Sequence, residues 1–213
     1  MNFSNYTCGE FSEQLASHSP TPGGGSAAAM TGSYGAALCA MAAVFTIGRE
    51  KYAAHEELMK ETLSQANNLR AEFLTAASAD SEAYNAVGAA LSMPKSTLDE
   101  KAARAQTLQE ALKQAAAVPF GVMELSLKAL RLTDKITGIS NRSVASDLGV
   151  AALSLRASLC GAWLNVRTNL TGIKDEAFAA EFRQKGEALM AEALPLADSI
   201  YDNISRACEG KTP

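Results

Sequence analysis

One carboxylate stands out among the residues that could do chemistry. Asp80 shares a predicted helix face, at spacings of three and four positions, with apolar or aromatic residues: Phe73, Ala77, Tyr84, Val87 and Leu91. A carboxylate on such a face points into the protein, where it must be paired, protonated or functional. Asp80 is therefore a candidate for a functional carboxylate. The alternative is a structural carboxylate bonded to a helix end or to Tyr84.

A second polar face is expected on a long helix from Ser143 to about Asn169. Small and polar residues recur there at helical spacing, while leucines occupy another face. The polar face consists of Asp147, Ala151, Ser154, Ser158, Gly161, Asn165 and Asn169. Such a helix could line a wet cleft, with Asp147 and Asn165 supplying the useful polar groups. It could equally pack closely against another helix through its small residues.

The glycine-rich stretch SPTPGGGSAAAMTGSYGAALCAMAAVFTIGREKY, residues 19–52, is the third candidate. Its prolines and glycines predict a sharp turn, after which Ser26 stands at the N-cap position of a helix of small residues. The N–H groups of Gly23, Gly24 and Gly25 could hold an anionic ligand at that helix N-terminus. The stretch lacks the Gly-Lys-Ser/Thr ending of a nucleotide-binding loop, and the simpler interpretation is a tight turn.

Lys51 and Tyr52 close this stretch. A Lys-Tyr pair can bind an anion, or donate a proton if burial moves its pKa. On the residues alone, a solvated lysine beside a tyrosine packed at a helix end is the simpler interpretation.

Helical patterns account for the rest of the chain, and no segment alternates with period two for long enough to be a strand. Thr7 with Glu10 fits a capping box, as do Ser96 and Thr97 with the acidic residues after them. Helices are expected at about residues 7–18, 26–48, 53–91, 96–132, 143–169 and 175–208, with a loop at 133–141, a kink or restart at Pro119 and a bend at Pro195. These elements predict an all-α fold, a single domain over residues 1–213.

Composition narrows the class of protein. A hydrophobic fraction of 47% with only 6% aromatic residues favours helices packed closely over small side chains, and a net charge of −4 argues against a nucleic-acid partner. The four cysteines show no C-x-x-C spacing, so neither a zinc site nor a disulfide framework is expected. No secretory signal or convincing membrane span is found, which predicts a cytoplasmic protein without a membrane partner.

These features together resemble the cyclodeaminase/cyclohydrolase family of folate enzymes. That family includes the cyclodeaminase half of formiminotransferase-cyclodeaminase and a stand-alone bacterial methenyltetrahydrofolate cyclohydrolase. The resemblance rests on the segments 19–26, 46–48, 51–52, 80–84, 94–95, 104, 116–119, 141, 147–152, 161–166 and 169–170. One departure is Ser140, where the family pattern has a glycine before Asn141.

The resemblance implies an all-helical homodimer that acts on one-carbon adducts of tetrahydrofolate. Asp80 and Asp147 would stabilise charge and transfer protons, and Lys51 with Tyr52 would assist proton transfer or bind the folate. Asn141 and Asn165 would hold the pterin or the reacting nitrogens, and Arg104 or Arg167 the glutamate tail. The substrate-binding residues are thus expected to be Gly23, Gly24, Gly25, Ser26, Tyr84, Asn141, Asn165, Arg104 and Arg167.

The expected reaction is cyclodeamination of 5-formiminotetrahydrofolate to 5,10-methenyltetrahydrofolate and ammonia. Hydrolysis of the methenyl compound to 10-formyltetrahydrofolate is the alternative. The expected partners are a reduced folate, with or without a polyglutamate tail, a second copy of the chain, and a formiminotransferase; no metal or further cofactor is expected. A rival from another class is a non-catalytic helical oligomerisation module, which would not explain Asp80 on an apolar face.

Overall fold

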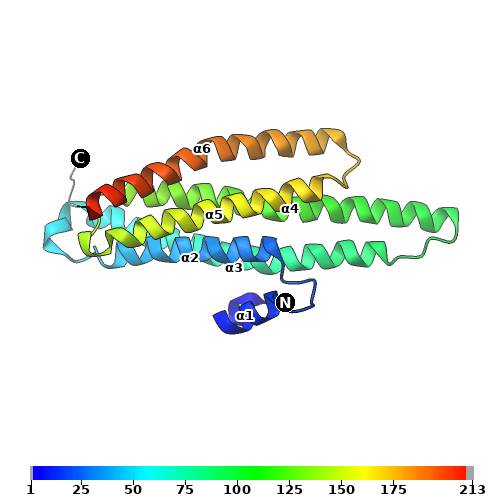
Figure 1. The fold of residues 1–213 in the computed structure, drawn as a ribbon, viewed down its shortest axis with the longest axis horizontal. Coiled ribbons are helices and arrows are strands. Elements are labelled where there is room, and N and C mark those ends of the chain that lie inside the picture. The colour runs from blue at the N-terminus through cyan, green and yellow to red at the C-terminus, as the bar shows by residue number, and fades with distance from the viewer. Residues whose placement is uncertain (1, 210–213) are drawn as a thin grey trace.

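The computed structural model describes residues 2–209, and within that range the regular elements are all helices, which confirms the predicted all-α fold. Five long helices lie side by side along the long axis of the molecule, and a short first helix lies beside them (Figure 1). The elements are η1 (Phe3–Asn5), α1 (Cys8–Leu15), α2 (Gly24–Val44), η2 (Glu50–His55), α3 (Glu56–Leu91), α4 (Leu98–Ile136), η3 (Arg142–Val144), α5 (Ala145–Leu170) and α6 (Glu176–Cys208).

Helix α2 lies between α3 and α5, and α4 packs against the same two helices from the opposite side of the bundle. Helix α6 covers α4 and α5. Close packing against α2 depends on glycine: a Cβ at Gly32 would lie 2.4 Å from the ring of Phe73 on α3, and one at Gly35 would lie 2.6 Å from Leu155 on α5. The small residues of α2 therefore let both neighbouring helices approach its backbone.

The caps of two helices are as predicted, and a third helix has a side-chain cap as well. Thr7 with Glu10 and Thr97 with Glu100 form complete capping boxes at the starts of α1 and α4. The side chain of Asp175 accepts the N–H of Phe178 at the start of α6. In each case a side-chain oxygen satisfies an N–H group that the helix leaves without an internal partner.

Several predicted boundaries are wrong. Helix α2 begins two residues early, with Gly23 at the N-cap, because the hydroxyl of Ser26 turns to α3 instead of capping its own helix. A 3₁₀ turn precedes α3, which is one unbroken helix. Helix α4 continues through Pro119 to Ile136, so the predicted loop at 133–141 begins only at residue 137. Thr133 is fully buried and bonds the carbonyl of Ala129, so its polarity does not mark a loop.

Two stretches, α2 and residues 142–170, are long and apolar enough to cross a membrane by length and composition alone. In the most apolar window of α2, 61% of the residues are buried inside the bundle, against 44% in the second stretch. The apolar character of α2 is thus largely that of a core helix, whereas more of the second stretch is exposed.

Candidate active site

A pocket of about 230 Å³ lies at the N-terminal end of α2. The α3–α4 hairpin continues beyond the first residue of α2 (Figure 1), and residues of α3, α4 and α5 line the pocket there. The Pro20–Gly23 segment, with a cis Thr21–Pro22 peptide bond, borders the same space. The lining residues are Pro20, Thr21, Gly23, Gly24, Gly25, Asp80, Tyr84, Val87, Leu112, Ala115, Asn165 and Asn169.

Asp80 is held against the first turn of α2. Its Oδ2 lies 2.9 Å from the hydroxyl of Ser26, which is fully buried and also lies 2.9 Å from the carbonyl of Ala77 and 3.1 Å from the hydroxyl of Ser81. The single Ser26 proton can serve only one of these acceptors. When it is donated to Ala77, a protonated Asp80 can donate to Ser26 in turn. The site therefore accommodates either protonation state of Asp80.

Burial raises the pKa of Asp80 above its ordinary value, because the charged form loses hydration, while hydrogen bonds from the hydroxyl and the backbone N–H of Ser26 act in the opposite direction. The position at a helix N-terminus also favours the charged form. Gly25 makes this contact possible, since a Cβ on it would lie 2.1 Å from Oδ1 of Asp80. The sequence-based alternative, a carboxylate bonded to a helix end, describes this contact correctly, yet the same carboxylate lines an open pocket.

Two asparagines one turn apart on α5 present amides to the pocket. Asn165 donates its Nδ2 to the carbonyl of Gly161 at 2.8 Å, and Asn169 donates its Nδ2 to the carbonyl of Ala115 on α4 at 2.6 Å. These bonds fix both side chains and leave each Oδ1 available as an acceptor. Tyr84, which is 54% exposed, stands on α3 one turn beyond Asp80. Of the predicted set, the pocket thus contains Asp80, Tyr84, Asn165 and the three glycines.

Four other predicted residues, Lys51, Tyr52, Asn141 and Asp147, lie at the far end of α2. The Nζ of Lys51 lies 5.5 Å from the ring centroid of Tyr52, whose hydroxyl accepts the N–H of Arg142 at 3.2 Å. Asn141 donates its Nδ2 to the carbonyl of Phe45 and accepts the N–H of Ser143, so its amide ties the loop before α5 to the end of α2.

Asp147 stands in the first turn of α5 at that same end. It is half-buried and makes no hydrogen bond or ion pair with another residue of the range 2–209. Asp147 precedes Asn165 by 18 residues on one helix, so at 1.5 Å per residue the two lie about 27 Å apart. Within one chain, the sequence-predicted site is therefore split into two clusters at opposite ends of α2.

The two arginines expected at a glutamate tail belong to neither cluster. Arg104 donates its Nε and Nη2 to the carbonyl of Leu91, at 3.2 and 3.1 Å, and so closes the end of α3 against α4. Arg167 is exposed on α5 between the two asparagines but does not line the pocket.

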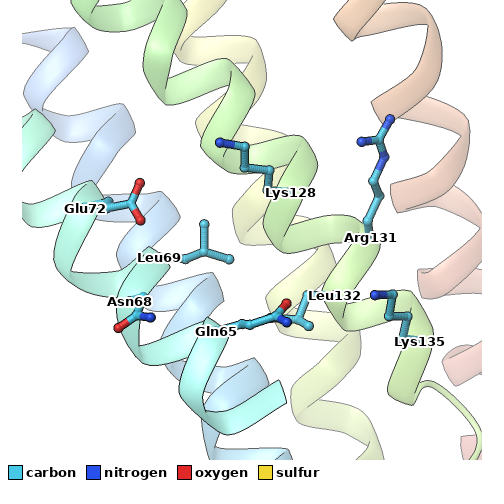
Figure 2. Close-up of a pocket in the computed structure, with 8 residues that line it drawn as sticks. All are labelled: Gln65, Asn68, Leu69, Glu72, Lys128, Arg131, Leu132 and Lys135. Carbon is cyan, nitrogen blue, oxygen red and sulfur yellow. The ribbon is translucent and has the colours of Figure 1, made fainter. Parts of the chain in front are cut away.

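A larger but shallower hollow, of about 370 Å³, lies between α3 and α4 (Figure 2). Arg131 at its edge is already paired with Glu192 on α6. None of the site residues predicted from the sequence lines this hollow. Its lining residues are Gln65, Asn68, Leu69, Glu72, Lys128, Arg131, Leu132 and Lys135. Exposed polar side chains of this kind are typical of a solvated groove, so we assign the candidate site to the pocket at Asp80. Within residues 2–209, no three His, Cys, Asp or Glu side chains are placed to hold a metal ion.

Sequence reasoning missed part of the pocket lining. Asn169 is on the predicted polar face but is not among the predicted site residues. Its position one helical turn after Asn165 indicates that the two side chains face the same space. Thr21, Leu112 and Ala115 carry no such signal, because only the meeting of α4 with the α1–α2 connection brings them to the pocket.

A largely buried carboxylate, fixed amides and a helix N-terminus surround one pocket of an all-helical bundle, an arrangement that suits acid–base chemistry. The family model described as formiminotransferase-cyclodeaminase matches residues 7–188. The chain belongs to the formiminotransferase-cyclodeaminase family, which confirms the resemblance read from the motifs.

Named relatives of the chain are enzymes of folate chemistry. A methenyltetrahydrofolate cyclohydrolase of Methylorubrum extorquens is 42% identical over 94% of this chain and 96% of that protein. The formimidoyltransferase-cyclodeaminase of Sus scrofa is 34% identical over 91% of this chain but only 36% of the pig protein, so the chain spans about a third of it. The crystal structure of a formiminotetrahydrofolate cyclodeaminase from Thermotoga maritima superposes with a TM-score of 0.80 at 29% identity, covering 97% of this chain and 98% of that one.

Proposed function

We propose that this protein is a folate one-carbon enzyme that acts on the carbon bridging N5 and N10 of tetrahydrofolate, and that its main reaction is hydrolysis of 5,10-methenyltetrahydrofolate to 10-formyltetrahydrofolate. The observation that carries the proposal is Asp80, a carboxylate with a raised pKa in a pocket built from the family's motifs. Similarity to the Methylorubrum cyclohydrolase over nearly its whole length favours hydrolysis over the cyclodeamination expected from the sequence.

Asp80 has the properties that this reaction requires. The substrate carries a positive charge at the reacting carbon, which an ionised carboxylate in a partly desolvated pocket stabilises. As water adds to that carbon, Asp80 accepts one of its protons; it then donates that proton to N5 as the bond from carbon to N5 breaks. The second water proton leaves to solvent. A raised pKa brings Asp80 closer to neutrality, where one group can serve both as base and as acid.

The two asparagines would orient the substrate. Each has its Nδ2 committed to a backbone carbonyl, so each offers an Oδ1 in a fixed position to an N–H group of the pterin. A preorganised acceptor costs no reordering when the substrate binds.

Cyclodeamination is the second candidate, favoured by the likeness to the Thermotoga cyclodeaminase. N10 would attack the carbon of the protonated formimino group, –CH=NH2+, and the N10 proton would pass through Asp80 to the departing nitrogen. That nitrogen would leave as ammonia, and the positive charge would remain on the methenyl product. A formiminotransferase would then be the class of enzyme that supplies the substrate, and we propose the cytoplasm as the compartment in which either reaction takes place.

The experiment gives purified protein each substrate in turn. With 5,10-methenyltetrahydrofolate, we expect the near-UV absorbance of the methenyl group to decay faster than in a matched sample of Asp80→Asn. With 5-formiminotetrahydrofolate, appearance of that absorbance together with free ammonia would establish cyclodeamination. If the protein changes neither substrate faster than Asp80→Asn, the proposed function is wrong.

We also propose that the protein acts as a homodimer that uses the exposed face of α2 and α5. The exposed apolar side chains on this face are Tyr34, Val44, Phe45, Val150, Leu153 and Leu164, with exposed fractions of 45–63%. Residues 19–48 contain no charged residue at all. At about 32 Å long and two helices wide, the face covers roughly 600 Å² in projection, which approaches the roughly 800 Å² that each partner buries in a standard interface.

Light scattering of two matched variants tests the homodimer. Leu153→Asp places a charge on the proposed interface and should give monomers. Tyr201→Asp, at a similarly exposed position on α6, should leave the dimer intact. A monomeric wild-type protein at micromolar concentration would contradict this part of the proposal.

A further inference from the structure

We propose that the active site is shared between two subunits: the Asp80 pocket of one chain is completed by Lys51, Tyr52 and Asp147 of the other. The inference rests on the proposed folate chemistry and on the proposed homodimer. In this arrangement, the cluster at the far end of α2 acts together with the Asp80 pocket of the other chain and not with the pocket of its own chain.

The first argument is distance. Groups that act on one reacting atom must come within about 3 Å of it, or reach it through one water. Asp147 lies about 27 Å from Asn165 along α5. Lys51 and Tyr52 lie at the Asp147 end, because the Tyr52 hydroxyl accepts the N–H of Arg142, three residues before that helix. No single substrate centre can touch both clusters of one chain.

The second argument is charge. Among the residues that line the pocket, Asp80 is the only one with a charged side chain. A reduced folate carries the carboxylates of its glutamate moiety, and a site for it needs a cation to offset them. Lys51 is exposed, and within residues 2–209 it makes no ion pair. It is therefore available to supply the positive charge that the pocket of a single chain lacks.

The third argument is symmetry. A two-fold dimer uses the same surface on both chains. Helix α2 carries no charged residue along its whole length, from the pocket to the second cluster, and α1 reaches it at Tyr34, whose hydroxyl lies 3.5 Å from the Sγ of Cys8. Antiparallel α2 helices also have opposed dipoles, which attract, whereas parallel neighbours repel. Tyr34, which is 47% exposed, stands ten residues from each end of α2. A two-fold axis beside it places the partner's Val44 next to Gly24, each about 15 Å from the axis.

The segment after Val44 then continues past the start of α2 in the other chain, where the pocket lies. In that arrangement the partner's Lys51 meets the carboxylates of the substrate. The hydroxyl of the partner's Tyr52 and the carboxylate of the partner's Asp147 face the reacting centre opposite Asp80. Each dimer holds two such sites, one at either end of the paired α2 helices.

Subunit complementation tests the proposal directly. One chain carries Asp80→Asn and the other carries Lys51→Ala with Tyr52→Phe, each with a different affinity tag, and heterodimers are isolated through both tags. A shared site leaves one of the two sites intact, so the heterodimer should recover about half of the wild-type turnover per dimer although each parent homodimer is inactive. Sites confined to one chain would give no recovery, and that result would overturn the proposal.

A matched heterodimer serves as the control. Asp80→Asn combined with Gly25→Ala places both changes in the same cluster, so both sites stay damaged and no recovery is expected. Circular dichroism and the Tm of every variant show whether each chain is folded. Wild-type turnover by the Lys51→Ala, Tyr52→Phe homodimer would likewise overturn the proposal.

A second measurement is independent of any activity, and so separates a failure of this inference from a failure of the proposed function. Chains with Pro20→Cys and chains with Lys51→Cys are mixed, with the exposed Cys8 and Cys208 replaced by serine in both. The two positions flank α2, which is about 32 Å long, whereas a disulfide needs Cα atoms within about 7 Å. We expect a cross-linked heterodimer on a non-reducing gel and none from either chain alone. Absence of the cross-link would refute the shared site even if wild-type protein were inert toward folates.

Discussion

Replacing Gly25 with alanine should impair catalysis much more than folding. The added Cβ would lie 2.1 Å from Oδ1, 2.6 Å from Cγ and 2.8 Å from Oδ2 of Asp80. Ordinary Cβ contacts are not closer than 3.0 Å, so the carboxylate must retreat by about 1 Å, a displacement that can lower turnover about 100-fold. We expect kcat/KM to fall by about that factor, measured by the decay of methenyl absorbance.

The cost in stability is smaller, because two effects oppose each other. Alanine gains up to about 1 kcal/mol over glycine inside a helix, while the forced contact costs about 1–3 kcal/mol, so the free energy of unfolding should fall by roughly 0–3 kcal/mol. Gly88→Ala is the matched control, since a Cβ at this position on α3 meets nothing within 4 Å. It should keep full activity.

The contact with Asp80 is the cause on which this prediction depends, and a double variant tests it. In an Asp80→Ala background the clash is gone, so Gly25→Ala should no longer destabilise the protein and should show only the gain in helix propensity. An equal loss of stability in both backgrounds would refute the reasoning, since two residues in contact must show coupling.

Three further results follow from the packing around α2. Burial raises the pKa of Asp80 from its ordinary 3.8, so the wild-type protein should lose stability relative to Asp80→Asn as pH rises from 3.8 through the raised pKa. Below pH 3.8 the difference between the two proteins should no longer depend on pH. Tm values of both proteins between pH 3.5 and 8 measure this. Ser26→Ala removes a hydrogen bond that lowers the pKa of Asp80, so a pH titration should show a still higher pKa, and denaturant unfolding a loss of about 1–3 kcal/mol. Gly32→Ala would put a Cβ 2.4 Å from the ring of Phe73 in the core and should cost about 1–3 kcal/mol or more in unfolding free energy, whereas unchanged stability would mean that α2 and α3 can separate without strain.

The fold could be predicted from local signals because each helix end carries its own chemistry. The capping boxes at Thr7 and Thr97 act within one turn, so the residues alone locate them. The predicted helix boundaries are wrong where tertiary packing, and not local sequence, determines the structure. Ser26 resembles an N-cap in sequence, but its hydroxyl bonds α3, and the polar residue Thr133 is buried inside α4.

Candidate site residues could be chosen from the sequence, but the way in which the fold groups them could not. Asp80 could be selected because a carboxylate on an apolar helix face is expensive unless something compensates it. Asp147 and Asn165 lie on one face of one helix, yet the 18 residues between them place them about 27 Å apart, in different clusters. Helical periodicity fixes the direction in which a side chain points, whereas the distance along the axis decides which residues act together.

The composition of α2 reflects demands on each side of the helix. On its buried side, Gly25, Gly32 and Gly35 allow a carboxylate and two helices to approach the backbone more closely than any Cβ would permit. On its exposed side, uncharged side chains around Tyr34 offer a surface that a second copy can cover. Glycine and exposed apolar residues both cost stability in an isolated monomer, through backbone entropy and hydration. Both costs are accounted for if the residues at the two ends of α2 belong to active sites and a second chain covers its outer face.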